Sequence, residues 1–281
     1  MIRAIATLVG VFFVGVLVYS FGTGLVTYLS EPHEETAEHV FHKHPEHYDF
    51  ASDGMMGKFD TAQLQRGFKV YKEVCSACHS MKYLSFRNFA DLGYNEDQIK
   101  AIAADWAIQQ PTVDPETGEA TTRPNIPSDP LPSPFPNEVA ARAANGNALP
   151  PDLSLITKAR HDGGNYVRSL LLGYQDPPAE LAEQFPDAMP GPGLNYNPYF
   201  ANLNLAMAAP IAIDDQVTYD DGTKATKEQM ATDVAAFLIW AAEPKLVERR
   251  QTGLAVLIFL LIATGLAYMS YRSIWADKKK H

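Results

Sequence analysis

Two long runs of apolar residues stand near the ends of the sequence and differ from everything between them. Ile5–Leu29 is 25 residues long without a charged side chain, and Gly253–Tyr271 is 19 residues long. As helices these runs would extend about 37 and about 28 Å, and the hydrocarbon core of a bilayer is about 30 Å thick. The pattern therefore predicts a membrane-spanning helix near each end of the chain.

The first apolar run has a second interpretation, as a secretory signal peptide. Its length exceeds that of a typical signal-peptide core, and no Ala-x-Ala cleavage site precedes Glu31. Gly22-Thr23-Gly24 is a looser cleavage site and keeps that interpretation open. We favour the first interpretation, in which residues 1–30 form a retained membrane anchor.

Charged residues beside the two runs predict their orientation. Arg3 precedes the first run, and Arg272 and Lys278–Lys280 follow the second. By the positive-inside rule both termini are then cytoplasmic, although Arg249-Arg250 weakens the asymmetry. The region between the runs is expected in the periplasm, at the inner (cytoplasmic) membrane of a bacterium or its organellar equivalent.

Residues 31–57 are polar and predict a linker between the first span and a folded domain. Five histidines lie in this stretch: His33, His39, His42, His44 and His47. No spacing among them is diagnostic of a metal site. We therefore interpret the stretch as a solvated periplasmic linker in preference to a metal site.

Apolar positions at helical spacing predict a helix over residues 58–80. Asp60 and Thr61 stand at its start, where their side chains can cap free backbone N–H groups. Its inward stripe is Leu64, Phe68, Tyr71 and Val74. A second helix is predicted over Glu96–Ile108, with Asn95 as its cap.

A third helix is predicted over residues 226–242. Thr226 and Gln229 have the spacing of a capping box, and Pro244 ends the helix. Its buried stripe is Met230, Val234, Phe237 and Ala241.

The chain between these helices is rich in proline and glycine. Eight prolines between residues 111 and 136 predict a segment that wraps the surface. Residues 137–172 return to helical patterning, and residues 173–225 are dominated by loops. The interruptions and turns are Pro150-Pro151, Gly163-Gly164, Gly191-Pro192-Gly193 and Asp220-Asp221-Gly222. We therefore expect a mainly α fold with long surface loops.

Composition narrows the class of partner. Hydrophobic residues make up 46% of the chain, enough for a buried core, and the formal net charge is −10. A nucleic-acid partner is excluded because phosphate binding needs clustered Lys and Arg. The acidic balance fits a basic protein partner.

The two cysteines of the chain lie in Cys75-Ser76-Ala77-Cys78-His79, at the end of the first soluble helix. In a C-x-x-C-H motif each thiol adds to a haem vinyl group, and the histidine supplies an axial nitrogen to the iron. A thioredoxin-like dithiol should instead follow a strand and open a helix, and a zinc site would need further ligands. We predict one covalently attached c-type haem and single-electron transfer.

Three methionines, Met81, Met189 and Met207, are considered for the second axial position on the iron. A thioether there would raise the reduction potential. Met81 is too close in sequence to His79 to reach the opposite haem face. Met189 and Met207 each combine small neighbours with a proline, and the residues alone leave both open. Either is equally explained as a buried side chain that fills a gap.

Arg160-His161 is a second cluster of interest. The guanidinium of Arg160 can pair with a haem propionate, and His161 is a competing iron ligand. Both residues are equally well explained as surface side chains.

Together these residues resemble the cytochrome c1 family, the haem subunit of the cytochrome bc1 (quinol–cytochrome c reductase) complex. The matching stretches run in order from about residue 57 to the C-terminus. They are Arg66–Cys75, Cys78–Met81, Ala140–Asn145, Leu149–Ser154, Ala159–His161, Asn197–Phe200, Asp221–Thr223 and Asp233–Pro244. An ordered series of this kind is more specific than C-x-x-C-H alone.

The resemblance implies site residues beyond the motif. Met207 in place of Met189 is the implied axial ligand, and Arg160 is implied at a haem propionate. Further residues implied beside the haem are Tyr166, Asn145, Pro150 and Pro151. The last apolar run matches the family's C-terminal anchor. The first departs from the family, because bacterial members usually begin with a cleaved signal peptide.

The resemblance also implies organisation and function. A cytochrome c-type haem domain is expected over residues 58–248, before an anchor and cytoplasmic tail over 249–281. The implied function is electron transfer from a Rieske iron–sulfur protein to a cytochrome c, in a respiratory-chain complex with cytochrome b that is dimeric in the family. The chain is then an enzyme subunit without its own acid, base or nucleophile. The alternatives are a free-standing membrane-anchored cytochrome and a membrane-tethered thiol oxidoreductase.

Overall fold

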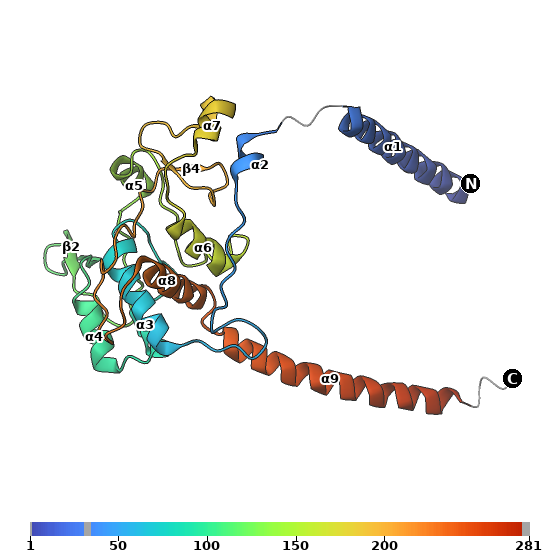
Figure 1. Ribbon diagram of the computed structural model, residues 1–281. Helices are drawn as coiled ribbons and strands as arrows, with labels where there is room; N and C mark the ends of the chain where they lie inside the picture. Colours follow the sequence, from blue (N-terminus) through green and yellow to red (C-terminus); the bar gives the residue numbers. More distant parts are fainter. Residues whose placement is uncertain (1, 31–34, 277–281) are drawn as a thin grey trace. The chain divides into compact units, whose positions relative to one another are not determined.

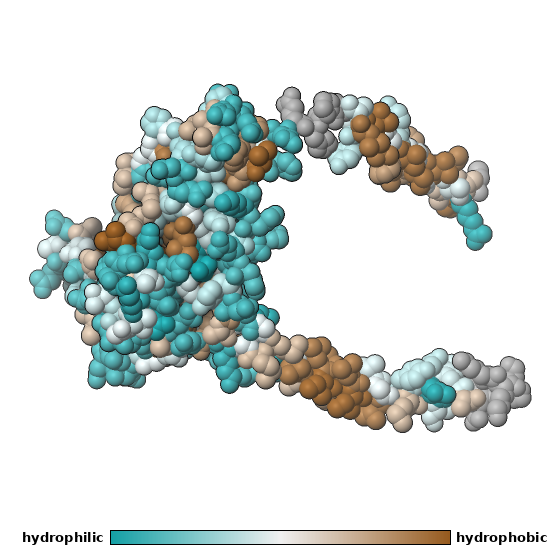
Figure 2. All heavy atoms as spheres, in the orientation of Figure 1, coloured by the Kyte–Doolittle hydropathy of each residue, from teal (hydrophilic) through white to brown (hydrophobic). Residues whose placement is uncertain are grey.

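In the computed structural model, which describes residues 2–30 and 35–276, a long helix forms on each apolar run (Figure 1). Helix α1 spans Ile2–Ser30 and helix α9 spans Leu246–Trp275. Both are long and apolar enough to cross a membrane, and both are lined with hydrophobic side chains (Figure 2). The mainly α fold class with an apolar helix near each end is confirmed. His33 and Lys278–Lys280 lie outside the described residues.

The chain divides into two units, residues 1–40 and 41–281. The first holds α1 and most of the short helix α2, Ala37–Phe41. The second holds a folded domain and α9. Besides the helices over residues 61–75 and 227–242, this second unit contains several shorter helices and strands. They are η2 Phe86–Leu92, α4 Glu96–Ala104, β1 Gln110–Val113, β2 Ala120–Arg123, α5 Glu138–Ala144, α6 Gly163–Leu172, α7 Ala179–Gln184, η3 Pro186–Ala188, β3 Asn195–Tyr196 and β4 Asn204–Leu205.

Helix α3, Thr61–Val70, starts at the predicted Asp60 cap, three residues after the start predicted at residue 58. The Asp60 side chain accepts hydrogen bonds from the backbone N–H groups of Ala62 and Gln63, at 2.9 and 3.3 Å. The helix continues as one π-helical turn, η1, over Tyr71–Cys75. The predicted inward stripe is confirmed, since Leu64, Phe68 and Tyr71 are buried and Val74 is partly buried against the core.

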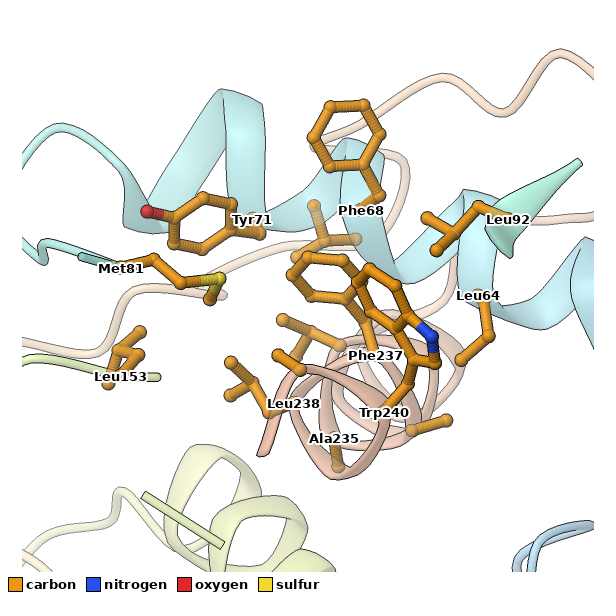
Figure 3. Packing of buried hydrophobic residues seen from close by; sticks show 14 of the residues in the cluster. Leu64, Phe68, Tyr71, Met81, Leu92, Leu153, Ala235, Phe237, Leu238 and Trp240 are labelled. Atoms are coloured by element: carbon orange, nitrogen blue, oxygen red, sulfur yellow. The ribbon is translucent and has the colours of Figure 1, made fainter. Parts of the chain in front are cut away.

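Helix α8, Lys227–Ala242, packs against α3 and carries much of the core. Figure 3 shows its Phe237, Leu238 and Trp240 among the side chains of this core. The predicted stripe on α8 is too narrow, because eleven of its sixteen residues are buried. The reason is that α6 packs on α8 as well as α3, so two faces of the helix are covered.

The crossing of α3 and α8 is very close at Gly67. A Cβ atom at this position would lie 2.0 Å from the carbonyl oxygen of Asp233 and 2.7 Å from the Cβ of Phe237. The neighbouring Arg66 donates from Nε to the fully buried carboxylate of Asp233, at 2.9 Å. Gln229 also donates to Asp233, so only the Thr226 half of the predicted capping box forms.

Elsewhere the structure corrects several boundaries. The predicted helix over 96–108 ends at Ala104, behind a complete Asn95–Gln98 capping box. The proline-rich segment contains an antiparallel hairpin of β1 and β2. Gly163-Gly164 does not interrupt a helix but starts α6. A Cβ at Gly164 would lie 2.5 Å from Ile239 Cδ1, so glycine permits the close approach of α6 to α8.

The polar stretch before α3 is bound to the domain along its second half. Backbone N–H groups donate from Lys43 to Pro198 O, from Glu46 to Ser169 Oγ and from Tyr48 to Asn165 Oδ1. Phe50 then enters the core. The described histidines His39, His42, His44 and His47 are exposed. The packed region therefore begins before the boundary predicted at residue 58.

Replacing Gly67 by alanine tests the helix crossing. Helix propensity alone favours alanine by up to about 1 kcal/mol. The clash with the Asp233 carbonyl should outweigh this gain, and we expect Gly67→Ala to lower the free energy of unfolding by about 3 kcal/mol. The measurement is denaturant unfolding of the full, haem-loaded chain in detergent.

Gly191→Ala is the matched control. Its nearest atom to an added Cβ is Leu194 Cδ1 at 4.0 Å, so stability should stay within about 0.5 kcal/mol of the wild type. A Gly67→Ala chain as stable as this control would show that the helices do not meet as described.

Candidate haem site

The C-x-x-C-H residues follow the π-helical turn at the end of α3. Ser76 N–H donates to Tyr71 O, five residues earlier, at 2.8 Å. Cys78 N–H and His79 N–H then both donate to Cys75 O, at 3.1 and 2.9 Å. The two thiols and the imidazole therefore leave the chain within one turn, as the spacing predicts. Both cysteines are free in the structure, with Cys75 partly buried and Cys78 exposed.

The environment of Cys75 does not suit thiol–disulfide exchange. Burial raises the pKa of its thiol to about 12, and the neighbouring Cys78 adds to the rise. A nucleophilic dithiol needs the opposite, a lowered pKa that gives thiolate at neutral pH. The raised pKa of Cys75 thus argues against the thioredoxin-like interpretation of the motif.

The His79 ring is oriented by a backbone carbonyl. Its Nδ1 lies 2.8 Å from Pro151 O, so Nδ1–H donates and Nε2 keeps a free lone pair. The Tyr71 hydroxyl donates to His79 O at 3.2 Å and holds the backbone of the same residue. Burial lowers the pKa of His79, against smaller opposing effects of Pro151 and Asp152. The imidazole is therefore neutral at pH 7, which is the form that binds a metal.

Asp152 ties the histidine loop to the loop that carries Pro151. Its carboxylate accepts from Ser80 Oγ at 2.7 Å, Lys82 N at 3.0 Å and Ser154 N at 3.0 Å. Burial raises the pKa of Asp152, but these donors outweigh it and hold the pKa below its ordinary value. The carboxylate is thus ionised at neutral pH and fixes Pro151 relative to His79.

Sequence reasoning missed the polar part of this arrangement. Pro150 and Pro151 were expected to lie against the haem, whereas the structure adds the hydrogen bond that Pro151 O accepts from His79. Asp152 and the Tyr71 hydroxyl were not predicted. A signal existed for Asp152, because a carboxylate directly after two prolines, in a loop without helix or strand, has neighbouring backbone donors to bind.

Three residues between positions 160 and 174 form a polar group that suits a haem propionate. Arg160 is exposed and lies near the Tyr166 hydroxyl, where it opposes the rise in the pKa of Tyr166 that burial causes. Tyr174 lies near Tyr166, and its hydroxyl is buried without a hydrogen-bond partner among the described residues. A buried hydroxyl without a partner is costly, and a carboxylate acceptor would satisfy it.

The predicted site also includes Asn145, and His161 was a competing candidate for the iron. Asn145 caps the end of α5 and donates from Nδ2 to Ala141 O at 2.7 Å. His161 is exposed. The role of Asn145 beside the haem stays a prediction.

The three methionines separate into one core residue and two loop residues. Met81 is fully buried in the same cluster as Tyr71 and Leu153, which are drawn with it in Figure 3. Met189 and Met207 are both partly buried. Asn204 donates to Ala188 O at 2.8 Å, and Asn195 donates to Met207 O at 3.3 Å, so the β3–β4 pair holds both loops. The choice between the two thioethers stays a prediction.

The donor set as a whole fits a c-type haem. It offers two thiols for the vinyl groups, one neutral imidazole with a free Nε2, a thioether on each of the two loops held by β3 and β4, and an Arg–Tyr–Tyr group for a propionate.

Comparisons with known proteins agree with this chemistry. The family model described as the cytochrome C1 family matches residues 50–278. The chain is 47% identical over 240 residues to cytochrome c1 of Rhodospirillum rubrum, covering 82% of this chain and 87% of that protein. It is 44% identical over 245 residues to mitochondrial cytochrome c1 of Saccharomyces cerevisiae, covering 87% of this chain and 74% of that protein. It is 42% identical over 245 residues to a Candida albicans protein named as the mitochondrial cytochrome b-c1 complex catalytic subunit. This match covers 87% of this chain and 79% of that protein.

Asp152→Ala tests the link between the two loops. The change leaves the Ser80 hydroxyl and two backbone N–H groups without their acceptor, and we expect a loss of about 2 kcal/mol in the free energy of unfolding. Asp97→Ala is the control, since among the described residues the Asp97 carboxylate is paired with the exposed Lys100 alone. Equal stability of the two variants would contradict the assigned role of Asp152.

The pH dependence of this effect has a definite sign. A carboxyl whose pKa is lowered by folding stabilises the protein above its unfolded pKa and loses that contribution as pH falls through the folded pKa. The stability difference between wild type and Asp152→Asn should therefore be full at neutral pH and shrink below about pH 4. A difference that persists unchanged in strong acid would refute the ionised form of Asp152.

Proposed function

The chain belongs to the cytochrome c1 family, and from this we propose that it passes single electrons from a Rieske iron–sulfur protein to a cytochrome c, as a subunit of a quinol–cytochrome c reductase. The observation that carries the proposal is the His79 imidazole, whose Nδ1 is engaged by Pro151 O and whose Nε2 is free, one residue after Cys78. The family implies haem c as the cofactor, and this group supplies one-electron chemistry when bound. The chain adds orientation and electrostatics, not an acid, base or nucleophile.

We place one covalent haem on Cys75 and Cys78. The two thiols would hold the group through carbon–sulfur bonds formed by addition to its vinyl groups, with each thiol proton going to the other vinyl carbon. No oxidant is needed for this addition. The protonated state that burial imposes on Cys75 is compatible with it.

The axial ligands in this proposal are His79 Nε2 and Met207. Met207 is preferred over Met189 on the family resemblance, and its backbone carbonyl is held by Asn195. A thioether ligand stabilises ferrous iron and raises the reduction potential, which suits transfer to a cytochrome c. Arg160 and Tyr166 are proposed at a propionate. The residues proposed beside the haem are Asn145, Pro150 and Pro151.

The proposed setting is a membrane complex with cytochrome b and a Rieske protein, dimeric as in the family. The Candida albicans relative is named as the catalytic subunit of the cytochrome b-c1 complex, and two helices of this chain have the length and composition of membrane spans. We propose that the haem domain faces the periplasm of a bacterial inner membrane. The net charge of −10 would attract a basic cytochrome c and raise its association rate.

Covalent attachment is tested on a denaturing gel. A haem stain should remain on the full chain after denaturation, because two thioether bonds survive it. Cys75→Ala/Cys78→Ala should lose the stain, whereas Met189→Leu should keep it. A wild-type chain without stain would remove covalent haem and leave the thiol oxidoreductase interpretation standing.

The partners are tested by purification in mild detergent. We expect the chain to elute with cytochrome b and a Rieske protein. The rate of cytochrome c reduction by this complex should fall as salt rises, because an acidic surface steers a basic partner through screened charges. Isolation of the chain alone would instead support a free-standing cytochrome, and a salt-independent rate would remove the steering claim.

A further inference from the structure

A closed loop over residues 51–57, here called the methionine loop, precedes α3. Lys58 N–H donates to Ala51 O at 2.8 Å, and Phe50 N–H donates to Asp53 Oδ2 at 2.9 Å. Gly57 has no room for a side chain, because a Cβ there would lie 2.0 Å from Asp53 O. The base of the loop is therefore held in one conformation.

The tip of the methionine loop exposes two consecutive apolar side chains. Met55 is 67% exposed and Met56 is 76% exposed. By contrast, Met81 and Met230 of the same domain are fully buried. Two flexible apolar side chains held side by side on a closed loop are typical of a surface that binds an apolar partner.

The loop is attached to the predicted membrane helix. Arg250 of α9 donates from Nη1 to Ser52 O and to Gly54 O, the latter at 2.7 Å. The uncharged run of α9 starts at Gly253, three residues later, which is about 4.5 Å along the helix axis. The polar interfacial layer on each side of a bilayer is about 6 Å thick or more. The loop therefore lies at the depth of this layer when α9 spans the membrane.

The immediate surroundings also suit a lipid surface. From Leu254 onward the large apolar side chains of α9 are exposed, so the surface next to the loop changes from polar to apolar within one helical turn. Lys58 at the base of the loop is exposed and can approach lipid phosphates.

We propose that Met55 and Met56 insert into the interfacial layer of the bilayer, and that the methionine loop is a membrane contact of the haem domain in addition to α9. A single helix leaves the domain free to tilt over the membrane. A second membrane contact beside the helix, held to it by the hydrogen bonds of Arg250, would restrict that tilt. The inference depends on α9 as a membrane span and not on the electron-transfer partners.

Cysteine labelling in lipid nanodiscs tests the proposal. Met56→Cys and Met55→Cys are made in the full, haem-loaded chain, with Val113→Cys on strand β1 as a control of similar exposure, 61%. The nanodiscs contain phosphatidylcholine and phosphatidylglycerol. We expect a charged maleimide to react with either loop cysteine about tenfold more slowly than with the control, as burial of an apolar side chain of this size implies. An uncharged, lipid-soluble maleimide should not show this difference.

Two outcomes would overturn the proposal. Loop cysteines that react with the charged reagent as fast as the control would place the loop in water. Cysteines that are accessible in nanodiscs and become protected only in a complex with cytochrome b would assign the loop to a protein partner. The haem absorbance of each variant shows whether it has folded, and the two loop positions report independently.

Discussion

The close contact of α3 with α8 at Gly67 is the constraint on which the rest of the domain depends. The missing side chain lets the two backbones approach, and Arg66 beside it satisfies the buried carboxylate of Asp233. A buried carboxylate is tolerable only with such a partner, so packing and charge at this crossing are inseparable. The crossing also sets the direction in which α3 points and hence the position of the residues that follow it.

The functional residues inherit their positions from this contact through a short chain of side chains. Tyr71, one turn beyond Gly67, packs its ring against Phe237 of α8 with centroids 5.7 Å apart, and its hydroxyl holds the backbone of His79. The ring of His79 is fixed by Pro151, and Asp152 ties the loop that carries Pro151 to Ser80. The imidazole is thus oriented by groups from two segments about 70 residues apart in sequence, which is the preorganisation expected of a metal ligand.

Local patterns in the sequence predicted where α3, α4 and α8 are capped, but they could not predict what tertiary contacts decide. The Asp60 and Asn95 caps depend on neighbouring residues alone and were predictable. The burial of α8 on two faces was not, because it depends on α6 packing from another part of the chain. Gly163-Gly164 was predicted to interrupt a helix, whereas α6 starts there and Gly164 leaves room for the close approach of Ile239. The grouping of Tyr174 with Tyr166 and Arg160 likewise required the fold.

The central proposal is that His79 and Met207 would together hold one haem iron. An experimental structure of the haem-loaded chain in lipid tests it most directly, because it identifies the atoms on the iron. The account predicts His79 Nε2 and the Met207 thioether as axial ligands, with thioether bonds from Cys75 and Cys78 to the macrocycle. Met189 or His161 at the iron in place of Met207 would contradict it.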